Sequence, residues 1–391
     1  MSDEANEPLG AKPALSVCLD DSPALGGLSR GIRDLAEAVG GRILSLDSGR
    51  FPPSADDACR NLTRLDVGSG PLVSRHLRLP RKVAEKLDRA ITESGLVVCH
   101  SLYRAHLPFV RRRCLRYGVP YWVVIHGMLD PWVISRHAVW KRAWLTVYGI
   151  RCLADASQVI FNTEVEREKA SPWCRRSITH VIPWPVDVPD VSDQEECRAE
   201  IRRRLELASN DRILLWLGRY DSLKRPTHTI AAFAAAHTPG WHLVMAGYDG
   251  DLNRAAVAQA ARQAGASHIH VLGPVVGEEK RHMLLAADAF VSLSWRENFG
   301  YALAEAAAAG LCCAVAPDHD LVADMPTQCR QWVAQDHSLH ESTRVLRELM
   351  ATPGVLPQDA GRRAREWAAS QLSRLHFSHA VSDARQPTRL P

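Results

Sequence analysis

The chain has 391 residues, a length that suits two domains of roughly 150–200 residues better than one. Its apolar fraction of 46% and charged fraction of 24% are those of a globular protein with a packed core. A net charge of only +4 gives no support to nucleic-acid binding, and no stretch approaches the ~20 consecutive apolar residues of a transmembrane helix.

The N-terminus and the cysteines indicate the compartment. Residues 1–7 are polar and acidic, unlike a signal peptide. The ten cysteines are scattered and form no C-x-x-C pair, which argues against a zinc site and fits reduced thiols. We therefore expect a cytoplasmic protein.

Apolar runs typical of parallel strands alternate with helical patterns in the first half. Strands are predicted at 14–19, 42–46, 96–99, 121–125, 158–161 and 178–182, and helices near 32–39, 82–92 and 107–117. Such alternation with short connections predicts an α/β domain with a doubly wound parallel sheet. Residues 48–80 are irregular, with several prolines and glycines, and carry no pattern that we can assign.

Glycines and histidines stand where strands of the first half end. Gly26 and Gly27 lie between the first strand and the first helix, where they predict either a phosphate cradle or a plain tight turn. The G-x-G-x-x-G and Walker patterns are missing, which disfavours nicotinamide and ATP. His100 and His126 follow strands, at the edge where open α/β sheets bind ligands. The alternative is that both histidines are structural.

Residues 131–144 mix tryptophans with basic residues at helical spacing. A helix that buries its tryptophans in the core has this pattern, and so has a helix that lies on a membrane surface. Residues 111–116 form a second basic stretch, with four arginines. Peripheral membrane contact through either stretch is therefore an open alternative to two ordinary helices.

Prolines in residues 183–189, followed by a charged stretch, indicate a linker between domains. The alternation then resumes, with strands predicted at 213–217, 242–246, 268–272 and 289–293, and helices near 226–236, 251–264, 277–287 and 301–309. We predict an N-terminal domain over 1–185, a second domain over 186–365, and a C-terminal helical segment, 366–391, that crosses back to the first domain.

Two cations follow the first strand of the second half. Arg219 and Lys224 lie in the loop that begins at Gly218, at the carboxyl edge of the predicted sheet. A planar guanidinium and a mobile ammonium together suit a diphosphate. The alternative, two unrelated surface cations, is less consistent with their shared place at the ligand edge.

The run from Ser294 to Glu305 reads as a strand-to-helix loop, an arrangement that places backbone N–H groups and a positive helix end at the mouth of a sheet. Gly300 allows close approach of a ligand to the backbone. Glu297, in the loop, and Glu305, about two turns along the helix, could accept hydrogen bonds from sugar hydroxyls on both sides of a diphosphate. The alternative is a capping loop before a core helix, with Glu305 on its solvated side.

Two D-x-D strings could hold a divalent cation on a nucleotide sugar, Asp249-Gly250-Asp251 and Asp318-His319-Asp320. Such short strings arise often by chance, and Arg219 with Lys224 already supplies positive charge. We expect no metal.

These residues together resemble a known family. Gly218-Arg219 with Lys224, then Glu297-Asn298-Phe299-Gly300 with Glu305, match in order and spacing the E-x7-E signature of the retaining GT-B glycosyltransferases of family 4 (glycosyl transferases group 1). The resemblance covers about residues 210–316. Gly26-Gly27 and His126-Gly127 match more weakly, and the run 126–132 is similar to members that build cell-surface polysaccharides.

The resemblance implies a GT-B fold, in which two Rossmann-like domains face a cleft, and a metal-independent transfer with retention from a UDP- or GDP-linked donor. Arg219 and Lys224, with Gly218, would bind the donor's diphosphate, and Glu305 would bind the ribose. Gly26-Gly27 would touch phosphate from the first domain.

The resemblance also assigns the donor sugar. Glu297 and the backbone of Asn298, Phe299 and Gly300 would hold it, and His126 would contact it near the reacting carbon. One departure concerns the linker, where Trp-Pro stands in place of the family's usual Asn-Gly and could alter the hinge or the cleft floor.

We therefore expect a hexosyltransferase that acts on a glycan or lipid-linked glycan acceptor in polysaccharide biosynthesis, cytoplasmic or peripheral at the inner face of the membrane. Two alternatives stay open: a nucleotide-sugar epimerase or hydrolase on the same fold, and a nonenzymatic partner protein with a transferase fold.

Overall fold

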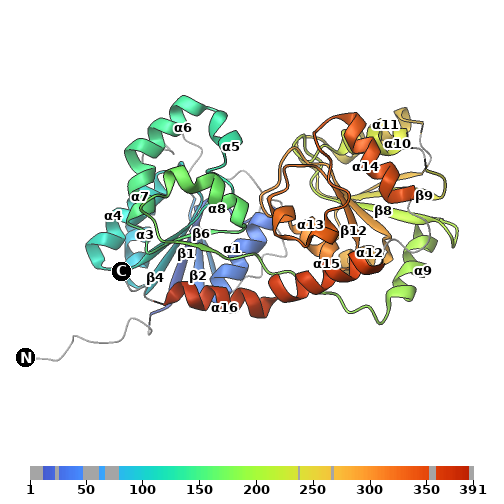
Figure 1. Ribbon diagram of the computed structural model, residues 1–391. Coiled ribbons are helices and arrows are strands. Elements are labelled where there is room, and N and C mark those ends of the chain that lie inside the picture. Colours follow the sequence, from blue (N-terminus) through green and yellow to red (C-terminus); the bar gives the residue numbers. More distant parts are fainter. Residues whose placement is uncertain are drawn as a thin grey trace, which may run out of the picture. The chain divides into compact units, whose positions relative to one another are not determined.

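The computed structural model describes residues 12–22, 26–46, 61–66, 79–236, 238–265, 268–351 and 358–386 (Figure 1). It divides into two compact units. Unit 1 extends to Trp184 and includes the chain again from Phe377, and unit 2 extends from Pro185 to His376. Each unit is an α/β layer structure, as expected; that the two face a common cleft stays a prediction.

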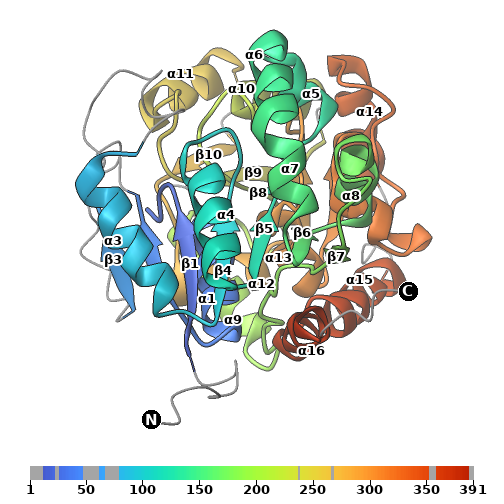
Figure 2. The same ribbon diagram turned by 90° about the vertical axis from the view of Figure 1, so that its left-hand side faces the viewer.

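Unit 1 contains a seven-stranded parallel sheet in the order β3-β2-β1-β4-β5-β6-β7. Its strands are β1 (Ala14–Cys18), β2 (Gly41–Ser45), β3 (Leu62–Arg64), β4 (Leu96–His100), β5 (Tyr121–Val124), β6 (Gln158–Phe161) and β7 (Thr179–Val181). The central strands β1, β4, β5 and β6 are buried along their whole length, because helices cover both faces of the sheet (Figure 2).

The helices of unit 1 follow its strands in alternation. They are α1 (Gly27–Ala38), α3 (Arg81–Thr92), α4 (His106–Tyr117), α5 (Pro131–Ser135), α6 (Ala138–Trp144), the π-helical turn η2 (Leu145–Gly149), α7 (Ile150–Ala154), α8 (Glu164–Ala170) and the 3₁₀ turn η3 (Ser171–Trp173).

Two features of unit 1 differ from expectation. Strand β3 lies inside the stretch that carried no assignable pattern, and residues 47–60 and 67–78 of that stretch lie outside the described residues. The single helix expected over 131–144 is two helices, because Arg136 is extended and His137 adopts a left-handed φ of 66°. Only Trp144 of its tryptophans is fully buried, whereas Trp132 and Trp140 are about 40% exposed.

Unit 2 contains a five-stranded parallel sheet in the order β10-β9-β8-β11-β12. Its strands are β8 (Arg212–Leu217), β9 (Trp241–Ala246), β10 (Ile269–Leu272), β11 (Ala289–Ser292) and β12 (Cys312–Val315). Its helices are α9 (Gln194–Arg204), α10 (Pro226–Ala236), α11 (Arg254–Gln263), α12 (Gly277–Ala286), α13 (Tyr301–Ala308), α14 (Leu339–Ala351) and α15 (Gln358–Gln371), with 3₁₀ turns η4 (Asp320–Asp324) and η5 (Thr327–Cys329). The strands predicted in this half are confirmed to within a residue.

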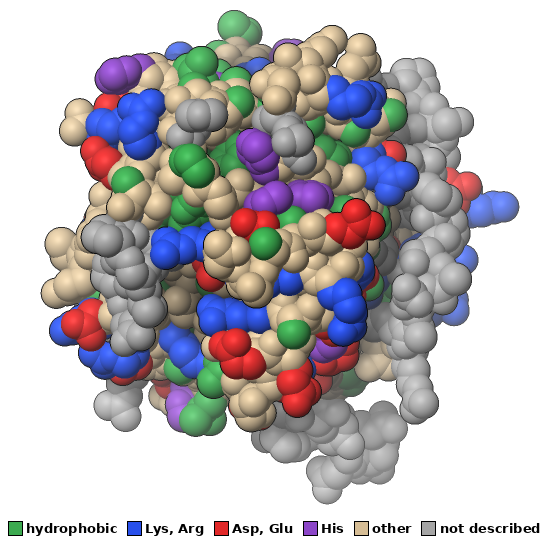
Figure 3. Space-filling model, turned by 90° about the vertical axis from the view of Figure 1, so that its right-hand side faces the viewer, with side chains coloured by type: hydrophobic (Ala, Val, Ile, Leu, Met, Phe, Trp, Pro, Cys, Tyr) green, Lys and Arg blue, Asp and Glu red, His purple; other side chains and the backbone are tan. Residues whose placement is uncertain are grey.

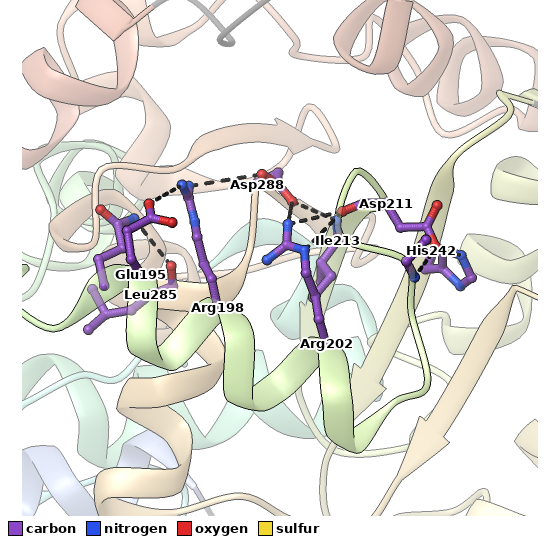
Figure 4. Close-up of polar contacts among 10 residues, drawn as sticks. Glu195, Arg198, Arg202, Asp211, Ile213, His242, Leu285 and Asp288 are labelled. Carbon is purple, nitrogen blue, oxygen red and sulfur yellow. Dashed lines mark hydrogen bonds and ion pairs between the residues drawn. The ribbon is translucent and has the colours of Figure 1, made fainter.

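Helix α9 occupies the charged stretch that the sequence analysis assigned to the linker. Arg202 donates to the Asp211 carbonyl at 3.0 Å and pairs with Asp288 at 3.2 Å, and Asp288 also accepts from the Ile213 N–H at 2.8 Å (Figure 4). The charges of this stretch therefore tie a helix to the start of the sheet, and the linker is shorter than expected.

The C-terminal segment consists of two helices, α15 and α16 (Arg374–Arg385), where one helical segment had been expected over 366–391. Helix α15 packs closely on α13, since a Cβ at Gly361 would lie 2.2 Å from the Gly310 carbonyl oxygen. From Phe377 on, α16 belongs to unit 1, where the Gln158 side chain donates to the Ala384 carbonyl at 3.0 Å.

Each sheet reverses its strand order at one place, between β1 and β4 in unit 1 and between β8 and β11 in unit 2. Loops at such a switch point diverge to opposite faces of the sheet and leave a crevice at the carboxyl ends of the strands. The loops after β8 and β11 carry the predicted donor residues of unit 2.

Candidate functional site

The loop after β8 begins with a close approach between two backbones. The Gly218 N–H donates to the Ala246 carbonyl at 3.2 Å, and a Cβ placed on Gly247 would lie 1.5 Å from the Gly218 carbonyl oxygen. Position 247 therefore accepts only glycine without a shift of the loop. The contact holds the start of the loop against the end of β9, and Arg219 follows directly.

Both predicted diphosphate-binding cations are paired with carboxylates. Arg219 Nη2 lies 2.9 Å from Asp221 Oδ2, and Lys224 Nζ pairs with Glu297 Oε1 from the loop after β11. Asp221 also accepts from the Lys224 backbone N–H at 2.9 Å, which shapes the loop between the two cations. Lys224 and Glu297, 73 residues apart in the chain, thus meet at the switch point.

The Glu297 carboxyl group is kept ionised. Burial raises its pKa, but the Lys224 ammonium, the nearby His319 ring and a hydrogen bond from the Ser294 hydroxyl at 3.1 Å outweigh burial and lower it below its ordinary value. Glu297 is therefore an acceptor at neutral pH and can receive hydrogen bonds from a ligand's hydroxyls.

His319 was considered only as the middle of a D-x-D string, yet it lies against the predicted sugar site. It is 3% exposed, its Nε2 lies 3.2 Å from the Ser292 hydroxyl, and its Nδ1 would lie 3.7 Å from a Cβ on Gly300. Burial lowers the pKa of His319 to about 4, so the ring is neutral. Its Nδ1, like the buried Oδ1 of Asn298, has no hydrogen-bond partner among the described residues.

Helix α13 begins at this loop. Gly300 precedes it with a left-handed φ of 72°, and no side chain caps its first turn. The Phe299 ring is buried against Tyr301, with ring centroids 5.2 Å apart, so its backbone rather than its side chain is available to a ligand. These features are those of a helix start that can receive an anion.

Glu305 lies on the buried side of α13, not on the solvated side that the alternative reading required. Its Oε1 is 2.7 Å from Lys280 Nζ on α12.

Arg225 is a residue that sequence reasoning missed. It has a left-handed φ of 53°, and its buried guanidinium stacks over the Trp295 ring at 4.2 Å and donates to the His337 carbonyl at 2.9 Å. Among the described residues no carboxylate pairs with it. Because the backbone of Trp295 also donates to the Leu223 carbonyl at 2.9 Å, these contacts join the loops after β8 and β11.

The site residues predicted in the first half of the chain lie in unit 1. Gly26 precedes α1 with a left-handed φ of 64°, a conformation that favours glycine, and a Cβ there would meet nothing within 4 Å. Gly27 is the first residue of α1, a helix of 12 residues with no side-chain cap. Among the described residues nothing lies close over this helix start, a feature compatible with the predicted phosphate cradle. Residues 23–25, before it, lie outside the described residues.

His126 follows β5 with a left-handed φ of 53° and is held by two rings. Its Nε2 lies 3.0 Å from His100 Nδ1, and its ring stacks on Trp184 with centroids 5.8 Å apart. The adjacent Gly127 N–H donates to the buried Glu166 carboxylate. Burial lowers the pKa of His126 to about 3, so the imidazole is neutral.

Trp184 is also packed tightly on α1, because a Cβ at Gly31 would lie 2.8 Å from the indole. The tryptophan that stands in the linker in place of the family's usual residue is therefore buried and packs against His126. His100 supports His126 and is itself fully buried, which fits the structural interpretation of His100.

The D-x-D strings have protein partners. Asp251 accepts from the Ser222 N–H and hydroxyl at 2.7 Å, Asp249 accepts from the Arg254 N–H at 2.7 Å, and Asp318 pairs with His337 at 2.8 Å. These three carboxylates are used within the fold, and the absence of a metal stays a prediction.

Unit 2 also contains side chains of types that can bind metals away from the D-x-D strings. Among the described residues, one group could converge on an ion, Asp193, Cys197 and His282, but Asp193 is engaged by Arg281. Histidine side chains also gather on one face of the molecule (Figure 3). His242 and His270, at the amino ends of β9 and β10, have ring nitrogens 3.1 Å apart.

Comparison with known proteins identifies both halves. Residues 26–185 match the model "Glycosyl transferase 4-like domain", and residues 198–367 match "Glycosyl transferases group 1". A GDP-mannose:cellobiosyl-diphosphopolyprenol alpha-mannosyltransferase of Xanthomonas oryzae pv. oryzae is 30% identical over 200 residues, which are 48% of this chain and 49% of that protein. The match thus spans about half the length of this curated relative.

Solved structures share the fold across almost the whole chain. Anabaena HepE in complex with UDP and glucose superposes with a TM-score of 0.74 at 14% identity, covering 95% of this chain and 98% of that one. Sucrose-phosphate synthase of Thermosynechococcus elongatus gives 0.72 at 17% identity, with the same coverage, and a glycosyltransferase of Rickettsia africae gives 0.75 at 12%, covering 97% and 100%. With both domain models matched in order, the chain belongs to the glycosyltransferases of the GT-B fold.

Proposed function

We propose that this protein transfers a hexose from a nucleoside-diphosphate sugar to a glycan or lipid-linked glycan, with retention of anomeric configuration and without a metal. The observation that carries the proposal is the Lys224–Glu297 pair at the β8/β11 switch point, beside Arg219. The pair supports the proposal, because a cation that would bind phosphate lies next to a carboxylate that would accept hydrogen bonds from sugar hydroxyls.

The difficult step in such a reaction is the departure of a nucleoside diphosphate while positive charge develops on the sugar carbon. Arg219 and Lys224 would stabilise the leaving phosphates, and removal of one such preorganised group typically costs ~10²–10³ in rate. In retaining transfer by front-face attack, the leaving phosphate itself would accept the acceptor's proton. No carboxylate is then needed as a covalent nucleophile.

Glu297 and the backbone from Asn298 to Gly300 would hold the donor sugar, and Glu305 the ribose. Gly26 and Gly27 would touch phosphate. His126 would contact the sugar as a neutral imidazole, since burial lowers its pKa to about 3. A neutral ring can hydrogen-bond a hydroxyl without repelling the developing positive charge.

The donor and acceptor are proposed by analogy. The Xanthomonas relative is named for GDP-mannose and a diphosphopolyprenol-linked acceptor, and HepE was solved with UDP and glucose. We therefore propose a UDP- or GDP-linked donor and a lipid-linked acceptor in cell-surface polysaccharide biosynthesis, with the protein in the cytoplasm and in peripheral contact with the membrane. No helix of the described residues is long and apolar enough to cross a membrane.

A thermal-shift panel with UDP, GDP, ADP and their common sugar conjugates tests donor binding. At ~100 times the dissociation constant a ligand adds about 2.7 kcal/mol of stability. We expect a shift with one base that is lost in an Arg219→Ala/Lys224→Ala variant. No shift with any nucleotide would favour a nonenzymatic partner protein.

Product analysis tests the chemistry. With donor and lipid-linked acceptor in EDTA, we expect a glycoside of the donor's own anomeric configuration by NMR. An inverted product, or turnover abolished by EDTA and restored by Mg²⁺, would contradict the proposal. Epimerised or free sugar formed equally fast without acceptor would instead identify an epimerase or hydrolase.

A further inference from the structure

An apolar stripe is exposed on one helical column of unit 1. Helix α6, the turn η2 and helix α7 follow one another without a break, as the stacked α6 and α7 show in Figure 2. Val139, Ala143, Val147 and Ile150 recur every three or four residues along this column, so they share one side of it. Val139 is 86% exposed and Val147 54% exposed. These four residues are called the α6–α7 stripe.

The same column buries its other side. Trp144, Leu145, Cys152 and Leu153 lie in the core of unit 1, where Trp144 packs on Tyr103 with ring centroids 5.3 Å apart. The column therefore carries two apolar sides, and one of them suffices to hold it on the sheet. Contiguous apolar surface on the outer side is unfavourable in water and marks a surface that contacts something else.

The charged side chains within residues 131–151 are all basic. Residues 131–151 contain no aspartate or glutamate. Arg136, Arg142 and Arg151 are exposed, and no carboxylate pairs with them among the described residues. Two half-exposed tryptophans, Trp132 and Trp140, belong to the same segment, and Arg136 stacks over Trp132 at 4.4 Å. Apolar side chains flanked by tryptophans and unpaired cations suit an anionic lipid interface.

The other basic helix, α4, fits such a surface less well. Arg111 donates to Asp155 at 2.6 Å and Arg113 lies 3.1 Å from Asp88, so two of its four arginines are neutralised within the fold. Its exposed apolar side chains are Leu115 and Tyr117, which do not form a stripe of comparable length. The structure thus distinguishes the two stretches that the sequence left as alternatives.

We infer that the α6–α7 stripe docks on the surface of an anionic lipid bilayer. The docking deepens the proposed function, because a lipid-linked acceptor would be presented at such a surface, but it does not depend on which sugar is transferred. Val139 and Val147 would enter the apolar boundary, while Arg142 and Arg151 would meet lipid phosphates.

Flotation of the full-length protein with phosphatidylcholine vesicles, with and without phosphatidylglycerol, tests the inference. We expect the protein to float with the anionic vesicles only, and high salt to weaken the binding. A Val139→Glu/Val147→Glu variant should lose about tenfold or more of its vesicle partitioning, and Arg142→Ala/Arg151→Ala should lose part of it. Leu375→Glu, at an aliphatic position on α16 that is 67% exposed, and Arg112→Ala/Arg116→Ala on α4 are the controls and should float like the wild type.

Each result has one reading. No flotation of the wild type, or equal flotation of Val139→Glu/Val147→Glu, overturns the inference, and loss in the α4 variant alone assigns the contact to α4. A wild type that sediments as a dimer, does not float, and becomes monomeric on Val139→Glu/Val147→Glu would make the stripe a contact between copies of this chain. The nucleotide thermal shift, measured on every variant, confirms folding. It also tests the proposed function separately, since a wild type that floats but binds no nucleotide would refute only that function.

Discussion

Removal of the Lys224 ammonium should separate its role in folding from its role in catalysis. In Lys224→Met, the Glu297 carboxylate, whose side chain is 13% exposed, loses its partner. Breaking a fully buried ion pair costs about 3–5 kcal/mol, and because Lys224 is itself 25% exposed we expect about 2 kcal/mol here. For a unit of this size, that lowers its melting temperature by about 4–8 °C.

A second substitution shows whether the loss of stability in Lys224→Met comes from the unpaired, buried Glu297 charge. In Lys224→Met/Glu297→Gln no unpaired charge remains, so we expect the stability to return to within about 1 kcal/mol of the wild type. Activity should not return, because the diphosphate still lacks its cation and the sugar its carboxylate. Both variants should transfer sugar ~10²–10³ times more slowly than the wild type or slower.

Urea denaturation and initial-rate assays measure the two quantities on the same preparations. The loss of stability in Lys224→Met should also diminish as the pH falls toward 5, because the unpaired Glu297 carboxyl then takes up a proton. An unchanged stability in Lys224→Met, or a double variant that regains activity while its stability stays low, would refute the reasoning.

Four further expectations follow from the described contacts. Gly247→Ala should displace the Gly218 carbonyl, with a loss of nucleotide affinity that calorimetry detects; unchanged affinity and stability would contradict the 1.5 Å clash. Lys280→Met should weaken UDP or GDP binding several-fold through Glu305, with Lys280→Arg as the conservative control. His319→Ala should raise the KM for the donor sugar more than the dissociation constant of the bare nucleotide, and equal changes would deny it a sugar contact. Stability should fall as the pH is lowered from about 6.5 toward 4, because histidines with pKa values lowered to about 3–4 bind protons only in the unfolded state. Each contributes about 1.4 kcal/mol per pH unit in that window, and a flat profile in urea denaturation would show that burial does not suppress their protonation.

Local pattern was enough to predict most of the scaffold. Buried parallel strands are continuous apolar runs, so β1, β4 and β8 could be recognised from composition alone. The chemistry of the donor loops was readable for a related reason. The cations, glycines and carboxylates of these loops directly follow strands in the sequence. Once the strands are recognised, the loop residues at their carboxyl ends are known as well.

Local pattern failed where distant residues decide a conformation. From the sequence, α9 resembles a charged linker. It is a helix because Asp288 and the residues at the start of β8 pair with its Arg202. A left-handed Arg225 has no sequence signature, because the contacts that hold it come from Trp295 and His337.

The sequence by itself determined which chemical groups this protein has, their order, and the sheets that carry them, because those follow from side-chain type and periodicity. Tertiary structure alone decided which groups meet. Lys224 pairs with Glu297, the His319 ring lies close to Gly300, and Trp184 stacks on His126. These contacts form because the strand order brings together loops that are far apart in the chain. It also decided that the α6–α7 stripe is exposed, because periodicity shows that a helix has an apolar side but not whether anything covers it.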